Sequence, residues 1–331
     1  MEKTSEVKPA PKLFPLIVER LRSQNYSNRT EEAYIQWIKR FILFHDKRHP
    51  RDMGTAEIEA FLNHLAVEKK VAASTQSQAK SALLFLYDEV LERNLPKLEN
   101  LTKLPAKKEL PVVLSKQEVQ AVLSGLEGTM WLMVSLLYGS GLRVMECLRL
   151  RVADIDFDRQ EILVRDPQGY KNRTTLLPGT LVHPLKTHLA YIEVLHAEDL
   201  SKGLGEVWMP EGLAKRYPNA GKDWQWQYVF PSSRLSVAQQ SGGVYRHHAD
   251  EKPIQRAVKN VAKQLGIKKT VTPNTLRHSF ATHLLEGGHD LQTVQRLLGH
   301  ANEANTKVYA QLVNTGGSGV SSPLDVIKPI V

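Results

Sequence analysis

A proline- and lysine-rich stretch limits how this chain can fold, because it separates two parts with helical periodicity. Between Pro96 and Pro111 the regular spacing of apolar residues stops, and three prolines stand among several lysines. Proline rings keep such a segment extended and prevent a helix from running through it. The 331 residues are enough for two modules, at least one with a substantial core. We therefore predict a flexible tail at 1–11, a helical module at 12–95, a linker at 96–112 and a second module at 113–315.

The spacing of apolar residues predicts that the first module is a helical bundle. Trp37 and Phe41 lie on one face of a helix that begins after Ser27, a favoured N-cap residue. Further apolar stripes follow at 58–65 and 83–90. Basic residues between the stripes have an ordinary explanation as the solvated face of the bundle, and phosphate contacts are the alternative. They are Lys39, Arg40, Lys47, Arg48, Arg51, Lys69, Lys70 and Lys80.

The second module combines helices with a β-hairpin. An apolar helix is predicted at 130–138, and short strands at 161–165 and 173–177. The residues Asp166-Pro167-Gln168-Gly169 between the strands are a turn signal, which places Lys171 near the hairpin tip. The fold class expected is mainly α with a small antiparallel β-hairpin or sheet.

Residues 200–249 are rich in aromatic and basic side chains and lack a clear period. Three of the five tryptophans of the chain, Trp208, Trp224 and Trp226, lie there, as does Arg246-His247-His248. The ordinary explanation is that the tryptophans fill a small satellite core and that the histidines lie in a solvated loop.

The composition narrows the function only slightly. The net charge of +9 and a pI near 9.4 favour a polyanionic partner, although many basic proteins have none. Cys147 is the only cysteine, which excludes an intramolecular disulfide and argues against a cysteine zinc site. We see neither an apolar run long enough for a bilayer nor a signal-peptide core at the N-terminus, so a cytoplasmic protein without a membrane partner is expected.

Four residues far apart in the sequence suit chemistry on a phosphodiester. Arg143 follows a glycine turn at a helix start, and Arg277 lies early in a later helix. His300 follows a helix that stops at a glycine, and Tyr309 comes nine residues later. Arginine binds phosphate through two parallel hydrogen bonds and stays charged, and a tyrosine can attack phosphorus and keep the bond energy as an ester. Such a reaction requires no metal and no cofactor.

Each of these residues also has an ordinary explanation on its own. The arginines could form ion pairs, with Glu146 available to Arg143, while His300 could cap a helix and Tyr309 could pack. Arg277 is expected off the apolar stripe of its helix and open to a groove. His278, His283 and His300 could be combined into a metal site on paper, but no acidic or cysteine ligand has suitable spacing, and we predict no metal.

Taken together, the motifs are far more specific. The chain has Gly141-Leu142-Arg143, then Thr275-Leu276-Arg277-His278-Ser279-Phe280-Ala281-Thr282-His283, then Leu298-Gly299-His300, then Tyr309. In this it resembles the tyrosine recombinase, or phage integrase, family. The resemblance implies a two-domain C-shaped DNA clamp, with Arg143 and Arg277 on the scissile phosphate, His300 in support and Tyr309 as the nucleophile. His278 and His283 would belong to the structural part of the motif.

Two positions depart from the family pattern. Asn274 stands where the family usually has histidine, and asparagine cannot donate a proton as an imidazolium does. Gln168 stands where the hairpin usually has its first lysine, which leaves Lys171 as the candidate general acid or as a contact to a neighbouring phosphate. Such losses would slow cleavage without preventing DNA binding. A weakened or inactive relative that binds folded single-stranded DNA without cleaving it is therefore the alternative.

Within the family, the chain looks like an integron integrase. The segment at 200–249 resembles the extra segment that recognises bases flipped out of a folded single-stranded attC hairpin, and Trp226, His247 and His248 are candidates for stacking on them. The resemblance implies recombination of attC hairpin and double-stranded attI sites in the bacterial nucleoid. It also implies a monomer in solution and a homotetramer on DNA, joined by a tail at 316–331 that packs in trans. A type IB topoisomerase is a third possibility, against which the segment and the tail argue.

Overall fold

The computed structural model describes residues 13–24, 26–102, 104, 110–166, 172–209, 217, 219–237 and 243–313. The chain divides into two compact units, Met1–Glu109 and Leu110–Val331. The tails expected at 1–11 and 316–331 lie outside the described residues, as do Gln168 and Lys171.

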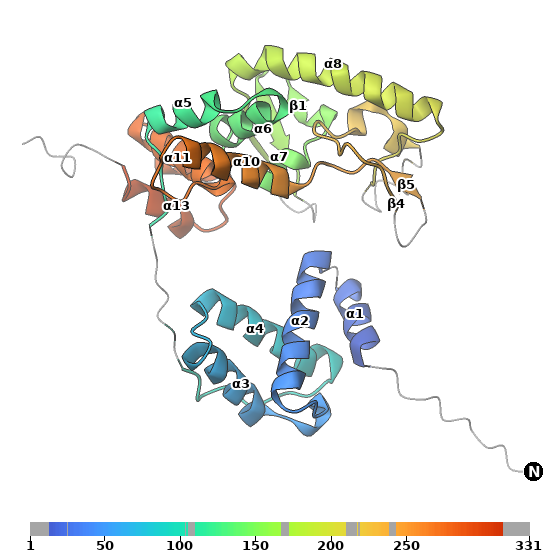
Figure 1. Cartoon of the computed structure of the whole chain (residues 1–331), viewed down its shortest axis with the longest axis vertical. Coiled ribbons are helices and arrows are strands. Elements are labelled where there is room, and N and C mark those ends of the chain that lie inside the picture. The colour runs from blue at the N-terminus through green and yellow to red at the C-terminus, as the bar shows by residue number, and fades with distance from the viewer. Residues whose placement is uncertain are drawn as a thin grey trace, which may run out of the picture. The chain divides into compact units, whose positions relative to one another are not determined.

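In the described part of the first unit, the regular secondary structure is all helical (Figure 1). Ser27 caps the second helix and accepts a hydrogen bond from the backbone N–H of Thr30, as its sequence predicts. Apolar faces of all the helices meet in one core, which includes Trp37 and Phe41. The helices are α1 Leu13–Ser23, α2 Asn28–Phe44, α3 Thr55–Val67 and α4 Ala73–Phe85, with a short 3₁₀ turn at Pro50–Asp52 and a π-helical end at Leu86–Val90.

The start of the predicted linker packs against this unit instead of running free. The carboxylate of Glu59 accepts hydrogen bonds from the backbone N–H groups of Glu99 and Asn100, at 2.8 and 2.9 Å. Asn63 accepts another from the backbone N–H of Thr102 at 2.7 Å. Polar side chains of α3 therefore extend the first unit beyond residue 95.

The second unit is built around the apolar helix α6, Gly128–Gly139, which packs against α5, α7, α8, α10 and α11 (Figure 1). Its core includes Cys147, whose side chain is completely buried. The other helices are α5 Lys116–Ser124, α7 Val144–Leu148, α8 Gly179–Ser201, α10 Glu251–Gln264, α11 Pro273–Glu286, α12 Leu291–Leu298 and α13 Ala304–Ala310.

A three-stranded antiparallel sheet in the order β1-β2-β3 contains the predicted hairpin. Strand β2, Glu161–Val164, pairs with β3, Arg173–Leu176, so that Val164 lies opposite Arg173. The two-residue strand β1, Ile155–Asp156, also pairs with β2, and the sequence does not predict it. Together with the helices, this confirms the predicted fold class of mainly α structure with small antiparallel β elements.

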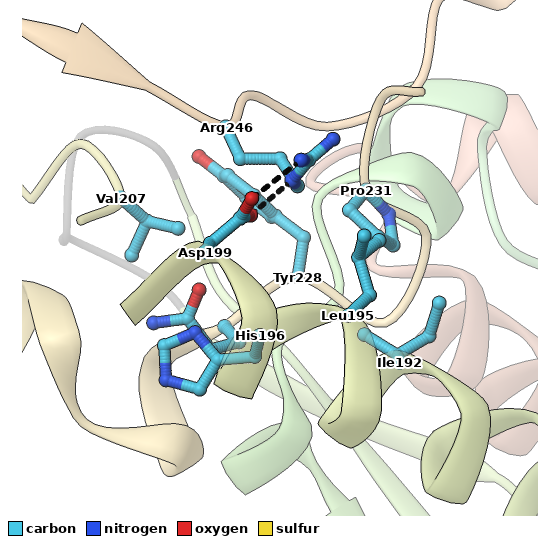
Figure 2. A pocket seen from close by; sticks show the side chains of 9 residues that line it. Ile192, Leu195, His196, Asp199, Val207, Tyr228, Pro231 and Arg246 are labelled. Carbon is cyan, nitrogen blue, oxygen red and sulfur yellow. Dashed lines mark hydrogen bonds and ion pairs between the residues drawn. The ribbon is translucent and has the colours of Figure 1, made fainter. Parts of the chain in front are cut away.

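The aromatic segment lies against the C-terminal half of α8. It contains 3₁₀ turns at Ala220–Lys222 and Trp224–Trp226 and a short pair of strands, β4 Ser236–Val237 and β5 Val244–Tyr245. Arg246 forms an ion pair with Asp199 of α8, with Nη2 2.7 Å from Oδ1 (Figure 2). No helix in the described ranges is long and apolar enough to cross a membrane.

Candidate active site

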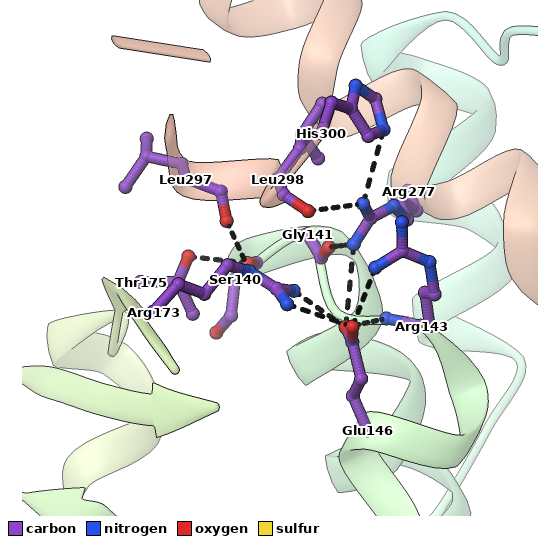
Figure 3. Close-up of polar contacts among 10 residues, drawn as sticks. All are labelled: Ser140, Gly141, Arg143, Glu146, Arg173, Thr175, Arg277, Leu297, Leu298 and His300. Atoms are coloured by element: carbon purple, nitrogen blue, oxygen red, sulfur yellow. Dashed lines mark hydrogen bonds and ion pairs between the residues drawn. The ribbon is translucent and has the colours of Figure 1, made fainter. Parts of the chain in front are cut away.

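The carboxylate of Glu146 is the centre around which the candidate arginines meet (Figure 3). Arg143 is the N-cap of α7, and its backbone N–H donates to Oε2 of Glu146 at 2.7 Å. Its Nη1 also donates to Oε1 at 2.7 Å. Gly141 brings the chain into this position through a left-handed turn with φ of +63°. Because 47% of the Arg143 side chain remains exposed, it can reach an outside ligand.

Arg173 is a second guanidinium on Glu146, and the sequence interpretation missed it. Its Nη1 and Nη2 donate to the two carboxylate oxygens at 2.9 and 2.6 Å, and its Nε donates to the carbonyl of Leu297 at 2.9 Å. Arg173 therefore ties β3 to α7 and to the end of α12. Strand alternation could have indicated it, because Arg173 shares a face with the buried Thr175.

Arg277 reaches the same carboxylate from inside the protein. Its Nη1 lies 3.5 Å from Oε2 of Glu146, and its residue is only 3% exposed. The expectation that Arg277 stands open to a groove is wrong, because its guanidinium donates to two buried carbonyls, those of Gly141 and Leu298. Burial, followed by the nearby Arg143, lowers the pKa of Arg277 to about 10, so it stays charged at neutral pH.

His300 links this cluster to α13. It follows Gly299, the left-handed C-cap of α12 with φ of +66°. Its Nε2 lies 3.3 Å from Nη2 of Arg277, and its Nδ1 lies 2.9 Å from Oγ1 of Thr306. Burial, with Arg277 next, lowers the pKa of His300 to about 4, so the ring is neutral at neutral pH and accepts the hydrogen bond from Arg277.

Tyr309 completes the group and is almost fully buried, at 4% exposure. Its ring stacks on His300 with centroids 6.1 Å apart and planes 20° apart. Burial raises the pKa of Tyr309, and the charges of Arg277 and Arg143 act in the opposite direction. The structure thus brings Arg143, Arg277, His300 and Tyr309 into one site, as the resemblance of the motifs implies.

The hydroxyl of Tyr309 is hydrogen-bonded to His278, with Oη 2.8 Å from Nδ1. The sequence interpretation assigned His278 to the structural part of the motif, but its ring faces the candidate nucleophile. The sequence feature that could have indicated this is the spacing of His278 from Asn274, because residues four positions apart lie on the same face of a helix. Asn274 itself is exposed, and its side chain makes no hydrogen bond to the described residues.

Gln168 and Lys171 lie outside the described residues, but the stem of their hairpin is fixed at the site. Arg173 is the first residue of β3 and lies two positions after Lys171. Its bonds to Glu146 and Leu297 therefore anchor the hairpin beside the arginine cluster. No group of three or more histidine, cysteine or acidic side chains that could hold a metal exists among the described residues.

The candidates from the aromatic segment form a second cluster around Tyr228. His247 and His248 lie 5.8 and 5.5 Å from the Tyr228 ring, between centroids. Burial lowers the pKa of both histidines, that of His248 to about 4. Both histidine rings are therefore neutral at neutral pH, and the guanidinium of Arg151 lies 4.6 Å over the Tyr228 ring.

Trp226 belongs to the same cluster but is partly used for packing. Arg151 lies 5.9 Å from the Trp226 ring and donates from Nη1 to the Trp226 carbonyl at 2.6 Å. Arg165 lies over the same ring at 5.2 Å. The ring is only partly exposed and packs against the small cluster Val207, Met209, Ala220 and Tyr228. The small satellite core that the sequence analysis gave as the ordinary explanation for the tryptophans is therefore present, and it covers part of the Trp226 ring. The sequence analysis did not identify Arg151 as a member of this cluster.

Two family models match the chain. One, described as phage integrase, N-terminal SAM-like domain, matches residues 13–97, and the other, described as phage integrase family, matches residues 113–315. An integrase/recombinase of Escherichia coli is 44% identical over 319 residues, which covers 96% of this chain and 95% of the relative. Tyrosine recombinase XerA of Thermococcus onnurineus (strain NA1) is 32% identical over 229 residues, covering 68% of this chain and 64% of the relative.

Solved structures show the same fold. The XerH site-specific recombinase bound to palindromic difH substrate, a post-cleavage complex, matches with a TM-score of 0.61 and 20% identity, over 92% of this chain and 83% of that one. The Tn1549 transposon integrase in complex with transposon right end DNA matches with a TM-score of 0.59 and 18% identity, over 95% of this chain and 96% of that one. The chain therefore belongs to the phage integrase family of tyrosine recombinases, which are site-specific DNA strand transferases.

Proposed function

We propose that this chain is a recombinase of integron-integrase type that cuts and rejoins DNA through a 3′-phosphotyrosyl intermediate on Tyr309. The observation that carries the proposal is the convergence of Arg143 and Arg277 on one carboxylate, with Tyr309 stacked on the histidine that bonds Arg277. Guanidinium groups held in this way are preorganised for the charge that develops on a phosphate during attack.

In this proposal the arginines bind the non-bridging oxygens of the scissile phosphate. Arg143 supplies the accessible cation, and Glu146 holds it together with Arg277 before substrate arrives. His300 supports Arg277, and Lys171 protonates the leaving 5′-oxygen. Asn274, one helical turn before Arg277, donates a hydrogen bond to the phosphate, and Gln168 contacts the DNA near the hairpin tip.

The proposed substrates are a folded single-stranded attC hairpin and a double-stranded attI site. Support comes from Trp226, His247 and His248 around the buried Tyr228, because flat rings that are neutral at working pH can stack on unpaired bases. Arg151 beneath the rings adds positive charge to this surface. His247 is the most exposed of the candidates and the one most open to a base.

We further propose the following organisation. The module at 12–95 contacts the DNA backbone, the module at 113–315 performs the chemistry with an inserted segment at about 200–249, and 96–112 links them. The tail at 316–331 packs in trans, so that a cytoplasmic monomer assembles into a tetramer on DNA in the nucleoid.

A covalent adduct tests the proposal. A bottom-strand attC hairpin with a nick next to the cleavage site should trap protein on DNA, visible as a slower band in a denaturing gel. Tyr309→Phe should form no adduct. Tyr138→Phe is a matched control, because its hydroxyl also bonds a histidine of α11, Nδ1 of His283 at 2.9 Å, without belonging to the site. Loss of adduct in both variants, or in neither, contradicts the assignment.

A second candidate function is DNA binding without cleavage. It is favoured by Asn274 in place of histidine and by the burial of the Tyr309 hydroxyl. It predicts tight, salt-sensitive binding of the hairpin with no adduct, and recovery of cleavage in Asn274→His combined with Gln168→Lys.

A further inference from the structure

The partner of the Tyr309 hydroxyl supports an inference that rests on the proposed function and deepens it. A tyrosine that attacks phosphorus must lose its proton, and Asn274 cannot accept one. The hydroxyl already has a close partner, Nδ1 of His278 at 2.8 Å. This distance lies within the range required of a general base and its proton.

The other groups around Tyr309 do not suit this role. His300 has both ring nitrogens engaged, with Arg277 and Thr306, and it presents its face to the phenol ring instead of a nitrogen to the hydroxyl. Arg143 and Arg277 are cations that stabilise a phenolate but do not accept its proton. Asn274 is exposed on the turn of α11 before His278.

His278 is in the right protonation state to accept a proton. Burial, followed by the charge of Arg277, lowers its pKa below the ordinary value of 6.5, so the ring is neutral at neutral pH. A neutral imidazole with its proton on Nε2 presents a lone pair at Nδ1. After the transfer, the imidazolium would lie beside Arg277, a repulsion that favours returning the proton when the strands are rejoined.

We propose that His278 is a catalytic residue, the general base for Tyr309. As Oη of Tyr309 bonds to phosphorus, its proton passes to Nδ1 of His278. The bond between phosphorus and the 5′-oxygen breaks, and that oxygen takes a proton from Lys171. In the reverse step the 5′-hydroxyl attacks the phosphotyrosyl ester and gives its proton back to the Lys171 amine. The bond between phosphorus and Oη of Tyr309 breaks, and His278 returns its proton to the departing phenolate.

Two variants and two substrates test the assignment. His278→Gln keeps a hydrogen bond to the hydroxyl but cannot take the proton, and His278→Phe removes both. Each is assayed for adduct formation on the nicked attC hairpin and on the same hairpin with sulfur in place of the bridging 5′-oxygen. A thiolate leaves without needing a proton, so the sulfur substrate separates activation of the nucleophile from protonation of the leaving group. His283→Gln is the matched control, because His283 also bonds a tyrosine hydroxyl through Nδ1.

The expected result is a loss of adduct rate of about 100-fold or more for both His278 variants, equally large on both substrates. Hairpin affinity and melting temperature should stay near those of wild type, and His283→Gln should react at the wild-type rate. A wild-type rate in His278→Gln overturns the inference, as does recovery on the sulfur substrate. A faster His278→Phe overturns it too, because the histidine would then hold the nucleophile back. Absence of adduct from the wild-type protein refutes the proposed function itself, and this inference with it.

Discussion

Replacing Glu146 by glutamine should weaken both the fold and the chemistry of the second unit. The carboxylate accepts four hydrogen bonds, two each from Arg143 and Arg173, and lies 3.5 Å from Arg277. Glutamine offers one oxygen in place of two, and its NH₂ group would face guanidinium donors. Because only 16% of the Glu146 side chain is exposed, water cannot replace the lost partner.

The magnitude follows from two independent arguments. Removing one partner of a buried ion pair costs about 3–5 kcal/mol. The arginine partners lower the pKa of Glu146 from 4.5 to about 2 in spite of burial, and this difference corresponds to about 3 kcal/mol. We expect Glu146→Gln to lower the free energy of unfolding by about 3 kcal/mol at neutral pH. For a unit of this size that loss lowers the melting temperature by about 6–12 °C.

The pH dependence has a definite sign. A carboxyl group whose pKa is lower in the folded state stabilises above its unfolded pKa of 4.5 and loses that contribution as the pH falls toward 2. The difference in the free energy of unfolding between wild type and Glu146→Gln should therefore be full at pH 7 and less than about half as large at pH 3. Adduct formation should also fall, since Arg143 and Arg277 lose their common anchor.

The assay is chemical unfolding followed by tryptophan fluorescence, which reports mainly on the second unit because four of the five tryptophans lie after residue 110. Glu303→Gln is the control, since Glu303 pairs with Lys307 on the surface, with both side chains more than half exposed. It should change the free energy of unfolding by less than about 0.5 kcal/mol. A loss below about 1 kcal/mol for Glu146→Gln, or one of equal size at pH 3 and pH 7, would refute the reasoning.

Three further predictions concern stability and binding. The neutral, half-buried ring of His300 has a pKa of about 4, against 6.5 when unfolded. Its contribution to stability is therefore full above pH 6.5 and falls by about 2 kcal/mol at pH 5, which unfolding of wild type and His300→Gln across this range measures. Gly141→Ala should cost at least about 3 kcal/mol in thermal unfolding, because its φ is +63° and the new Cβ would lie 2.4 Å from the ring of Phe280. Gly128→Ala, at φ of +54° with nothing within 4 Å, isolates the backbone part and should cost about 1–2 kcal/mol. Trp226→Ala should weaken binding of a hairpin with unpaired bases by about 1–3 kcal/mol at fixed salt, but not binding of fully paired DNA, as measured by fluorescence anisotropy; equal losses on both would contradict stacking.

Features encoded by local pattern could be predicted from the sequence. The Ser27 cap, the hairpin and the glycine stop before His300 depend on neighbours a few residues away. The resemblance carried by the motifs also indicated which residues meet, and it implied a role for each of them.

Features that depend on pairing across long separations could not be predicted. Arg173 donates a hydrogen bond to Leu297, which lies 124 positions away in the sequence. Arg277 donates to the carbonyls of Gly141 and Leu298, and the residues next to Arg277 in the sequence do not indicate these partners. The packing of the first linker residues could not be predicted for the same reason, since Glu59 binds the backbone of Glu99 and Asn100 from 40 and 41 positions away. The hydrogen bond between His278 and Tyr309 could not be predicted either, because the two residues lie 31 positions apart in the sequence.

The enclosure of Cys147 makes the protein convenient for single-molecule work. The thiol lies in the centre of the second unit, and burial raises its pKa, so maleimide dyes should leave it untouched in the native state. A cysteine introduced on the surface of either unit would then be the only reactive position, without any need to remove the natural one. Dye pairs placed in this way could report the distance between the two units with and without DNA.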